Sequence, residues 1–467
     1  MDRPYELLAS PTMSDESMFS NLPEHIVHHI LSFLGMADIV RLSFTSKSCR
    51  ESCVSISSLD FDALQYPTLR GFQDQLMNIC ERFLSLRNGW KLSRLCVHSQ
   101  FIENRTESSR VVTMLHMAVG CDVEFLDLEF SQEEEWEMFS LPICIFHCGS
   151  LKSLTINMHC LNLKFPSALR FSNLQSLSLK SIWLVDECFG ESVSCCKFLR
   201  ELWLENVCGV ENLTIENSNL ERFSILYSYH PELCHLNISG QKLIEINVEW
   251  RFKSPLSKSV KISAPNLRYL KWVGYITGHN CLGSLMHLER VELFLQCRDL
   301  DTTQELPNIF RSVISTKDLH LHDHGIMNLH NYDPLPISSE NVQCLSLSIQ
   351  KFEDYLVPAM ASLLRRFPKL KALDIKYSLP IRTTTMSGFD KVYWQSQHLE
   401  FIHQLESVSI ELLDGETELE LAIYILEHAT KLKKMVIFYS LSLPSGFISR
   451  IGKDRMSSSP VVVLKKI

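Results

Sequence analysis

A short hydrophobic unit, L-x-x-L-x-L, recurs along most of the chain and restricts the folds that the sequence can adopt. Its apolar triplets are Leu92-Leu95-Val97, Val123-Leu126-Leu128, Leu151-Leu154-Ile156, Leu174-Leu177-Leu179, Leu199-Leu202-Leu204, Leu220-Phe223-Ile225, Leu243-Ile246-Val248, Leu267-Leu270-Trp272, Leu288-Val291-Leu293, Val342-Leu345-Leu347, Leu370-Leu373-Ile375, Leu405-Val408-Ile410 and Leu432-Met435-Ile437. The last two positions of each triplet alternate as on a short strand with one buried face. One unit cannot bury its own apolar side, so neighbouring units must stack into a continuous core.

Most triplets start roughly 21 to 28 residues apart, which is the period of leucine-rich repeats. We therefore predict an α/β fold, a curved solenoid with a parallel sheet on its concave face and helices, short helical turns or loops on its convex side. The array is irregular, because extra half-spaced triplets occur at Val210-Leu213-Ile215 and Leu233-Leu236-Ile238. The stretch "ECFGESVSCCKFLREL", which ends at Leu202, is expected to contain the convex helix that returns to the next strand.

The segment from Asn21 to Cys49 precedes the repeats and is apolar at helical spacing. Its apolar residues recur every three to four positions: Ile26, Val27, Ile30, Leu31, Phe33 and Leu34. Pro23 suits a first helical turn, Gly35 marks a stop, and a second short helical pattern begins at Asp38. Helices of this length are marginal alone in water, so their apolar faces need a partner surface, either the rest of this chain or another protein.

This segment resembles an F-box, the short helical module that docks on the Skp adaptor of cullin-RING ubiquitin ligases. "LPEHIVHHILSFL" is similar to its first helix, and "DIVRLSFTSKSCRESC" is similar to the later run D-x-V-R-x-S-x-x-S-K-x-W-R-x-x-W. The pattern positions that match are Asp38, Val40, Arg41, Ser43, Ser46, Lys47 and Arg50. Cys49 and Cys53 stand where plant F-boxes of this type usually carry tryptophan, and the smaller side chains reduce packing there.

The resemblance implies that the leading "LP" and the Ile/Leu stripe contact the adaptor. The expected adaptor-binding residues are Leu22, Pro23, Ile26, Ile30, Leu31 and Leu34. The alternative is that the same helices only cap the end of the solenoid.

The C-terminal part is similar to the FBD motif that follows leucine-rich repeats in many plant F-box proteins, on the stretch from His398 to Ser440. A helix is expected from Glu418 to Leu426, followed by a strand at "LKKMVI", and Val461 to Leu464 adds an edge strand or stays disordered. The resemblance to a plant F-box/leucine-rich-repeat protein with an FBD-like motif thus covers nearly the whole chain. The expected segments are a disordered N-terminus (1–17), the all-α F-box (18–62), leucine-rich repeats (63–350), FBD-like terminal repeats (351–445) and a tail (446–467).

Bulk composition excludes several classes of protein. The chain has 467 residues, of which 45% are hydrophobic and 21% charged, which is typical of globular proteins. A net charge of -9 argues against broad attraction to nucleic acid or anionic lipid. Without a visible secretory signal or membrane-length apolar run, we expect a soluble intracellular protein, nuclear, cytoplasmic or both. Its 16 cysteines should then be reduced, and most should act as small core residues.

Catalytic signatures are missing from the sequence. It contains no G-x-G-x-x-G, G-x-x-x-x-G-K-[ST] or G-x-S-x-G motif, and its four-apart cysteine pairs have no matching second pair. His320, His322 and His324 would share one face of a strand with Asp323 nearby, so zinc is chemically conceivable. A structural reading places these histidines on the exposed side of a repeat. We expect no catalytic residue, no cofactor and no metal.

The side chains between the inward strand positions are the expected target-binding surface. They are Asp127, Thr155, Ser178, Trp203, Ser224, Asn247, Lys271, Glu292, His320, Ser346 and Asp374. Among them we select Trp203, Asn247, Lys271, Glu292 and His320. Trp203 is either an interface anchor or a side chain packed on adjacent repeats.

The family resemblance implies a non-catalytic substrate receptor of a Skp-cullin-F-box ubiquitin ligase, with cullin and RING subunits recruited through the adaptor and a protein as target. The alternative is a leucine-rich-repeat interaction scaffold that does not assemble into a ligase.

Overall fold

The structure is a computed structural model and divides into two compact units, Met1–Ile182 (unit 1) and Trp183–Ile467 (unit 2), which we treat separately. It describes residues 22–62, 70–87, 89–101, 105–132, 138–164, 171–184, 188–227, 232–252, 254, 257–297, 305–332, 338–350, 355–378, 389–412, 416–439 and 461–466. The N-terminus predicted to be disordered, 1–17, lies outside the described residues.

Unit 1 begins with three short helices, α1 (Glu24–Leu31), α2 (Met36–Ser43) and α3 (Lys47–Ser55). This confirms the helical pattern and the stop at Gly35, which precedes α2. The side chain of Ser46 caps α3 by accepting a hydrogen bond from the Cys49 backbone N–H at 3.1 Å. Cys49 and Cys53 are both buried, so these thiols act as small core residues.

A parallel sheet follows directly in unit 1. Strand β1 (Ser58–Asp62) pairs with β2 (Arg94–Phe101), β2 with β3 (Phe125–Gln132), and β3 with β5 (Ser153–Lys164). Strand β4 (Met138–Ser140) pairs with the second half of β5, and β6 (Ser176–Leu184) reaches the boundary of the unit. The connecting helices are α4 (Arg70–Ser85), α5 (Arg105–Gly120) and α6 (Ile143–His147).

Strand β1 belongs to the segment that we predicted to be entirely helical. Ile56, Leu59 and Phe61 fit the L-x-x-L-x-L unit, although the sequence analysis did not assign them, and all three are buried. The first strand of the repeat sheet therefore follows α3 after only two residues.

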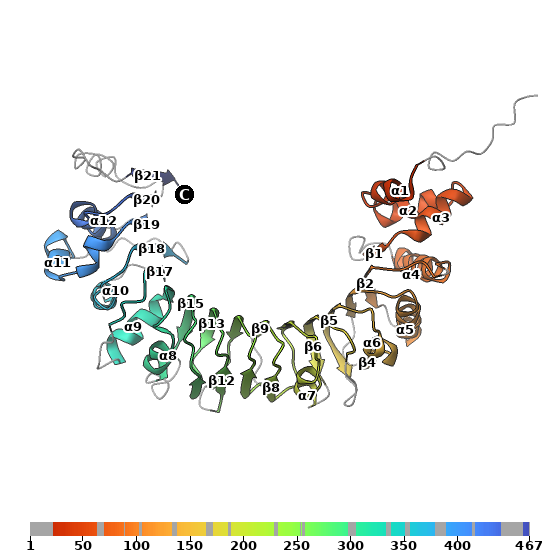
Figure 1. Cartoon of the computed structure of the whole chain (residues 1–467), viewed down its shortest axis with the longest axis horizontal. Coiled ribbons are helices and arrows are strands. Elements are labelled where there is room, and N and C mark those ends of the chain that lie inside the picture. The colour runs from red at the N-terminus through yellow and green to blue at the C-terminus, as the bar shows by residue number, and fades with distance from the viewer. Residues whose placement is uncertain are drawn as a thin grey trace, which may run out of the picture. The chain divides into compact units, whose positions relative to one another are not determined.

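Unit 2 contains a longer parallel sheet in which each strand pairs with the next. The order by pairing is β7 (Glu201–Glu205), β9 (Arg222–Tyr227), β11 (Glu245–Trp250), β13 (Tyr269–Tyr275), β15 (Arg290–Gln296), β16 (Asp318–His322), β17 (Cys344–Ile349), β18 (Ala372–Tyr377), β19 (Ser407–Leu412), β20 (Lys434–Tyr439) and β21 (Val461–Lys466). Its helices are α7 (Phe189–Ser194), α8 (Glu305–Val313), α9 (Asp323–Tyr332), α10 (Leu356–Leu364), α11 (Lys391–Ser396) and α12 (Glu416–His428), with a short 3-10 helix at Glu400–Gln404. Figure 1 shows α8 to α12 on the outer side of the strands of this unit.

The repeat triplets form the core of both units, as predicted. Leu95 and Val97 in unit 1, like Leu202 and Leu204 in unit 2, are fully buried. The residue between the two inward positions faces the other side of the sheet. This mixed α/β fold with long parallel sheets confirms the leucine-rich-repeat prediction.

In residues 212–282, strands occupy the convex side, where we expected helices, short helical turns or loops. Strands β8 (Asn212–Glu216), β10 (His235–Ser239), β12 (Ser259–Ser263) and β14 (His279–Leu282) form a second parallel sheet here. The half-spaced triplets end in β8 and β10, where the side chains of Leu213 and Leu236 are buried in the core. Repeats this short leave too few residues between main strands for a helix, so an extended segment covers the core instead.

The C-terminal elements agree with the prediction. The helix expected from Glu418 to Leu426 lies within α12, the "LKKMVI" strand is β20, and β21 adds an edge strand to it. Among the described helices, none has both the length and the apolar character needed to cross a bilayer.

Candidate functional site

Helix α1 carries apolar side chains on two different sides. Val27 and Leu31, four residues apart, are buried in unit 1. Leu22, Ile26, Ile30 and Leu34 follow the same spacing on another side, and each remains 36–40% exposed. A helix that needs only one apolar side for its own fold thus presents a second one to its surroundings.

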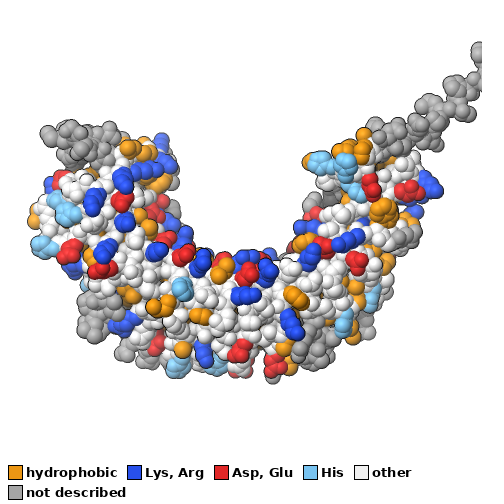
Figure 2. Space-filling model, in the orientation of Figure 1, with side chains coloured by type: hydrophobic (Ala, Val, Ile, Leu, Met, Phe, Trp, Pro, Cys, Tyr) orange, Lys and Arg blue, Asp and Glu red, His pale blue; other side chains and the backbone are white. Residues whose placement is uncertain are grey.

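Phe33 extends this second side and is 75% exposed. The sequence analysis did not select it, although it belongs to the same three-to-four spacing. We define the α1 surface as Leu22, Ile26, Ile30, Phe33 and Leu34. Figure 2 shows hydrophobic and histidine side chains gathered at this end of unit 1.

The structure places Leu31 differently from the other adaptor-binding candidates, because its side chain is fully buried. It packs inside unit 1 and is unavailable to a partner, so its role is to hold α1 in place. Pro23 is exposed and is the N-cap residue before α1, so it lies one position before the first turn in which we expected it.

A polar contact also fixes α1 against α3. His28 Nε2 lies 2.8 Å from Ser55 Oγ, whereas the exposed ring of His29 packs edge-on against Phe33 at 4.9 Å between centroids. The orientation of the α1 surface is therefore set by buried apolar contacts on one side of the helix and by this hydrogen bond.

The second candidate surface is the row of side chains between inward strand positions. The strand register of unit 2 places Trp203 opposite Ser224, Ser224 opposite Asn247, and Asn247 opposite Lys271. The row continues through Glu292, His320, Ser346 and Asp374. The positions chosen from sequence spacing are thus neighbours on one face of one sheet.

Members of this row differ in how much surface they offer. Trp203 is 38% exposed, and its indole N–H donates to Glu205 Oε2 at 3.3 Å, while Asn247 and Lys271 are half-buried. Glu292 is only 9% exposed and accepts two hydrogen bonds from Arg290, at 2.7 and 3.1 Å. Among the five selected residues, Trp203, Asn247 and Lys271 are therefore the more accessible ones, and the half-buried Ser346 and Asp374 continue the row beyond His320.

His320 lies in a more enclosed position than the exposed one we expected. Its side chain packs edge-on against Phe294, and its Nε2 lies 2.9 Å from Ser348 Oγ, so the residue is 7% exposed. Burial, and next the charge of Lys376, lowers the pKa of His320 to about 4. A neutral ring is thereby maintained at neutral pH.

The three histidines that the sequence analysis considered as a conceivable zinc site do not share one strand. His320 and His322 belong to β16, but His324 is in α9, because the strand ends at His322. The ring of His322 stacks on that of His324, and Asp323 lies between them in sequence, which leaves a His322, Asp323 and His324 group without His320.

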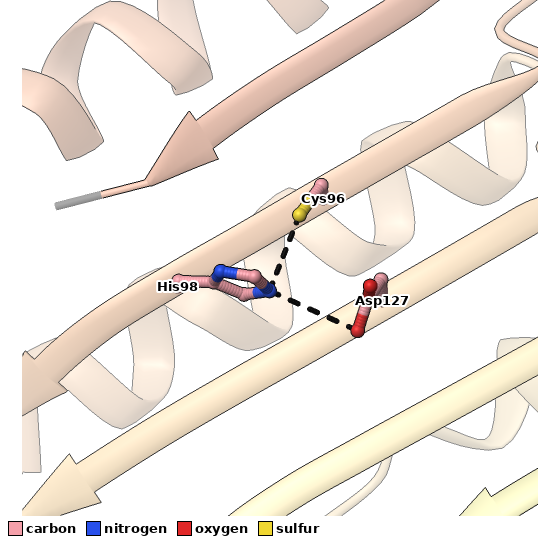
Figure 3. A group of neighbouring side chains, drawn as sticks. All are labelled: Cys96, His98 and Asp127. Atoms are coloured by element: carbon pink, nitrogen blue, oxygen red, sulfur yellow. Dashed lines mark hydrogen bonds and ion pairs between the residues drawn. The ribbon is translucent and has the colours of Figure 1, made fainter. Parts of the chain in front are cut away.

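A second group of potential metal ligands lies in unit 1, and the sequence analysis did not find it. Cys96 Sγ lies 3.2 Å from His98 Nε2 on β2, and His98 Nε2 lies 3.8 Å from Asp127 Oδ1 on β3 (Figure 3). In the sequence, the signal that could have revealed this group is the C-x-H spacing of Cys96 and His98 on one expected strand. Asp127 comes from the next repeat, and only the strand pairing places it opposite Cys96.

Comparisons with known proteins agree with the order of segments along the chain. An F-box domain model matches residues 19–60, the model "FBD-associated F-box protein At5g56370, LRR repeats" matches residues 113–279, and an FBD model matches residues 397–437.

Two relatives from Arabidopsis thaliana align over most of the chain. The chain is 28% identical to the putative F-box/FBD/LRR-repeat protein At4g03220, over 90% of this chain and 88% of the relative. It is 23% identical to the FBD-associated F-box protein At5g22730, over 91% of this chain and 88% of the relative.

Proposed function

We propose that this plant-type F-box, leucine-rich-repeat and FBD chain is the substrate-recognition subunit of a Skp-cullin-F-box ubiquitin ligase. Its F-box docks the Skp-type adaptor, and its repeats bind a target protein. The observation that carries the proposal is the α1 surface, a stripe of apolar side chains left exposed on α1 and its flanking residues, while a neighbouring side of the helix is already buried.

The physical argument rests on the cost of exposed apolar surface. Burying such surface gains about 25 cal/mol per Å², and a contiguous exposed apolar patch is typical of an interaction site. Unit 1 already uses Val27 and Leu31 to attach α1. A helix that served only as a cap would have no use for Ile26, Ile30 and Phe33 on its other side. A foreign helical subunit, the adaptor, is the partner that we propose for them.

On the target side, we propose the strand row at Trp203, Asn247 and Lys271, together with the less exposed Glu292 and His320. The ligase function needs no catalytic residue in this chain, because the lysine-modifying chemistry belongs to the cullin- and RING-bound partners. The chain would act by tethering, which raises the effective concentration of the target near the ubiquitin-loaded enzyme. We further propose that it works in the nucleus, the cytoplasm or both, without binding nucleic acid or membrane.

We propose that the chain is divided into four functional segments. We retain 18–62 as the F-box, 63–350 as repeats, 351–445 as the FBD-like terminal repeats and 446–467 as the tail. In this arrangement α12, β20 and β21 cover the end of the unit 2 sheet, which a repeat array needs in order to protect its last apolar face.

Co-purification with a Skp-type adaptor tests the docking surface. We expect the full chain to co-purify, and the double variant Ile30→Asp/Leu34→Asp to lose the adaptor while its circular dichroism spectrum is unchanged. Met286→Asp is the control, because it places the same charge on an exposed apolar residue that lies in unit 2 and outside the α1 surface. Retained binding by the double variant would refute the docking surface, and a wild-type chain without adaptor would favour the scaffold alternative.

Proximity labelling in cells tests the receptor function. Transient targets should accumulate around the wild-type chain when the proteasome is inhibited, and the Trp203→Ala variant should label fewer of them. Neighbours that do not change on proteasome inhibition would instead support a scaffold that is not part of a ligase.

A further inference from the structure

Unit 1 holds a cluster of thiol, imidazole and carboxylate groups on one face of its sheet. Leu95 and Val97 of β2 point into the core and are fully buried, so Cys96 and His98 face the opposite side. The strand register places Cys96 between Asp60 of β1 and Asp127 of β3, and His98 beside Asp62 of β1. Three neighbouring strands thus bring potential ligands to one place.

The distances in this cluster match those around a tetrahedral zinc ion. With Zn–S near 2.3 Å and Zn–N near 2.0–2.1 Å, a thiolate sulfur and an imidazole nitrogen on one ion lie about 3.5 Å apart. Cys96 Sγ and His98 Nε2 are 3.2 Å apart, and His98 Nε2 and Asp127 Oδ1 are 3.8 Å apart. All three ligand atoms lie within 4.8 Å of one another. One ion could contact all three after small side-chain rotations.

The ring nitrogen of His98 that does not face Cys96, Nδ1, lies near a carboxylate, as in many zinc sites. Nε2 faces Cys96 and Asp127, while Nδ1 lies 3.8 Å from Asp62 Oδ1 (Figure 3 shows the first two contacts). Zinc-binding histidines almost always place their other ring nitrogen against a carboxylate, carbonyl or water, which fixes the ring and strengthens the ligand. Asp62 supplies this carboxylate.

Local charge favours a cation. Three carboxylates surround the ring and the thiol: Asp60, Asp62 and Asp127. One cation, the Arg94 guanidinium, lies 3.7 Å from Asp127 Oδ2, so it offsets part of this negative charge. Asp60 and Asp62 also line a cleft of about 410 Å³ between the leading helices and β1. The side chains of His98 and Asp127 are 21% and 31% exposed, so solvent reaches the cluster.

We propose that Cys96, His98 and Asp127 form a binding site for a zinc-class divalent cation, with Asp62 orienting His98. Thiolate, imidazole and carboxylate together are a zinc ligand set, and three protein ligands leave a fourth position for water, for Asp60 or for a group of a bound partner. The site joins two consecutive repeats. It is independent of the proposed ligase function.

The group of His322, Asp323 and His324 in unit 2 is less suited to a metal. Asp323 Oδ1 accepts a hydrogen bond from the His324 backbone N–H at 2.7 Å, and Oδ2 accepts one from the Gln350 backbone N–H at 3.0 Å. Both oxygens therefore already accept backbone hydrogen bonds, one at the start of α9 and the other from the residue that follows β17. In the Cys96 cluster, the contacts are between side chains that a metal ion could replace.

Metal content of the purified full chain is the first test. Mass spectrometry of the metal after dialysis against zinc should find one zinc ion per chain in the wild type, and none above background in Cys96→Ser or in His98→Asn. Because the chain has 16 cysteines, Cys121→Ser is the matched thiol control and should keep the ion. His324→Gln should keep it too. A wild type without zinc, or equal zinc in Cys96→Ser, would overturn the site.

Cobalt substitution identifies the ligands. Co²⁺ added to the metal-free chain should produce a thiolate-to-cobalt charge-transfer band and the visible bands of a tetrahedral ion. Cys96→Ser should abolish the charge-transfer band, whereas Asp62→Asn should keep it and weaken zinc binding by about 10–100-fold in a chelator competition. A band that survives in Cys96→Ser would assign the metal to other cysteines and overturn the proposal.

Discussion

Ile30 and Leu31 are adjacent in α1, yet the side chain of Ile30 is 38% exposed and that of Leu31 is fully buried. One residue of helix rotation, about 100°, separates a side chain that belongs to the core of unit 1 from one that belongs to the α1 surface. The two residues are both aliphatic and similar in size, so they provide a matched pair. Their substitution should separate stability from binding.

Truncation of Leu31 should destabilise unit 1, and truncation of Ile30 should not. Leu31→Ala removes a buried side chain and leaves a cavity, so we expect a loss of about 2–5 kcal/mol in the free energy of unfolding. Ile30→Ala should stay within about 0.5 kcal/mol, as for most surface substitutions. Urea denaturation followed by circular dichroism measures both. Equal losses would contradict the assignment of the two sides of α1.

The start of α3 depends on a single side-chain cap. Ser46 Oγ accepts the Cys49 N–H, so Ser46→Ala should lower the free energy of unfolding by about 1 kcal/mol. Ser48→Ala makes the same chemical change inside α3, where alanine is the better helix former, and it should be neutral or slightly stabilising. Thermal denaturation of the two variants compares them directly. A Ser48→Ala variant as unstable as Ser46→Ala would show that the cap is not the cause.

Gly274 in β13 cannot accept a side chain. Its φ is +125°, and a Cβ at this position would collide with the backbone carbonyl of Trp250 on the neighbouring strand. Gly274→Ala should therefore cost at least about 1–3 kcal/mol in the free energy of unfolding. Gly325→Ala in α9 is the control, because a Cβ there meets no atom within 4 Å and should stabilise the helix by about 0.5–1 kcal/mol. Denaturation curves that coincide for the two variants would disprove the close approach.

His320 should make the stability of unit 2 depend on pH. Its pKa of about 4 in the folded chain lies below the value of the unfolded chain, about 6.5, so between these values the unfolded chain binds more protons. The contribution of His320 is therefore complete above pH 6.5 and is lost as the pH falls toward 4. His320→Gln, which can still hydrogen-bond to Ser348, should flatten the stability profile in this window. An unchanged slope would mean that the ring is not shielded as the structure indicates.

The leucine triplets show how far periodicity alone predicts this fold. A strand with one buried face requires alternating apolar residues, so triplets such as Leu202 and Leu204 identified the strands, their inward positions and the outward row. Their spacing also placed Trp203, Asn247 and Lys271 in register, because each repeat contributes one strand to the same sheet.

Periodicity did not identify what covers the core. The half-spaced triplets at Leu213 and Leu236 were recognised as irregular, but a pair of buried aliphatic residues fits a convex strand or a short turn equally well. Pairing between strands more than 20 residues apart decided in favour of the second sheet. Similarly, the end of β16 at His322 separated His324 from the other two histidines, and no local signal predicted that strand end.

The sequence by itself determined the repeat, the helical character of the leading segment, the C-terminal helix and strand and the family resemblance, because each depends on residues close together in the chain. Only the tertiary structure decided that Leu31 is buried while Ile30 is exposed, that His320 is enclosed by Phe294 and Ser348, and that Asp127 lies beside Cys96 and His98. Burial and ligand geometry depend on which strand or helix lies alongside. That neighbour is set by packing across repeats, which the local pattern of side chains does not contain.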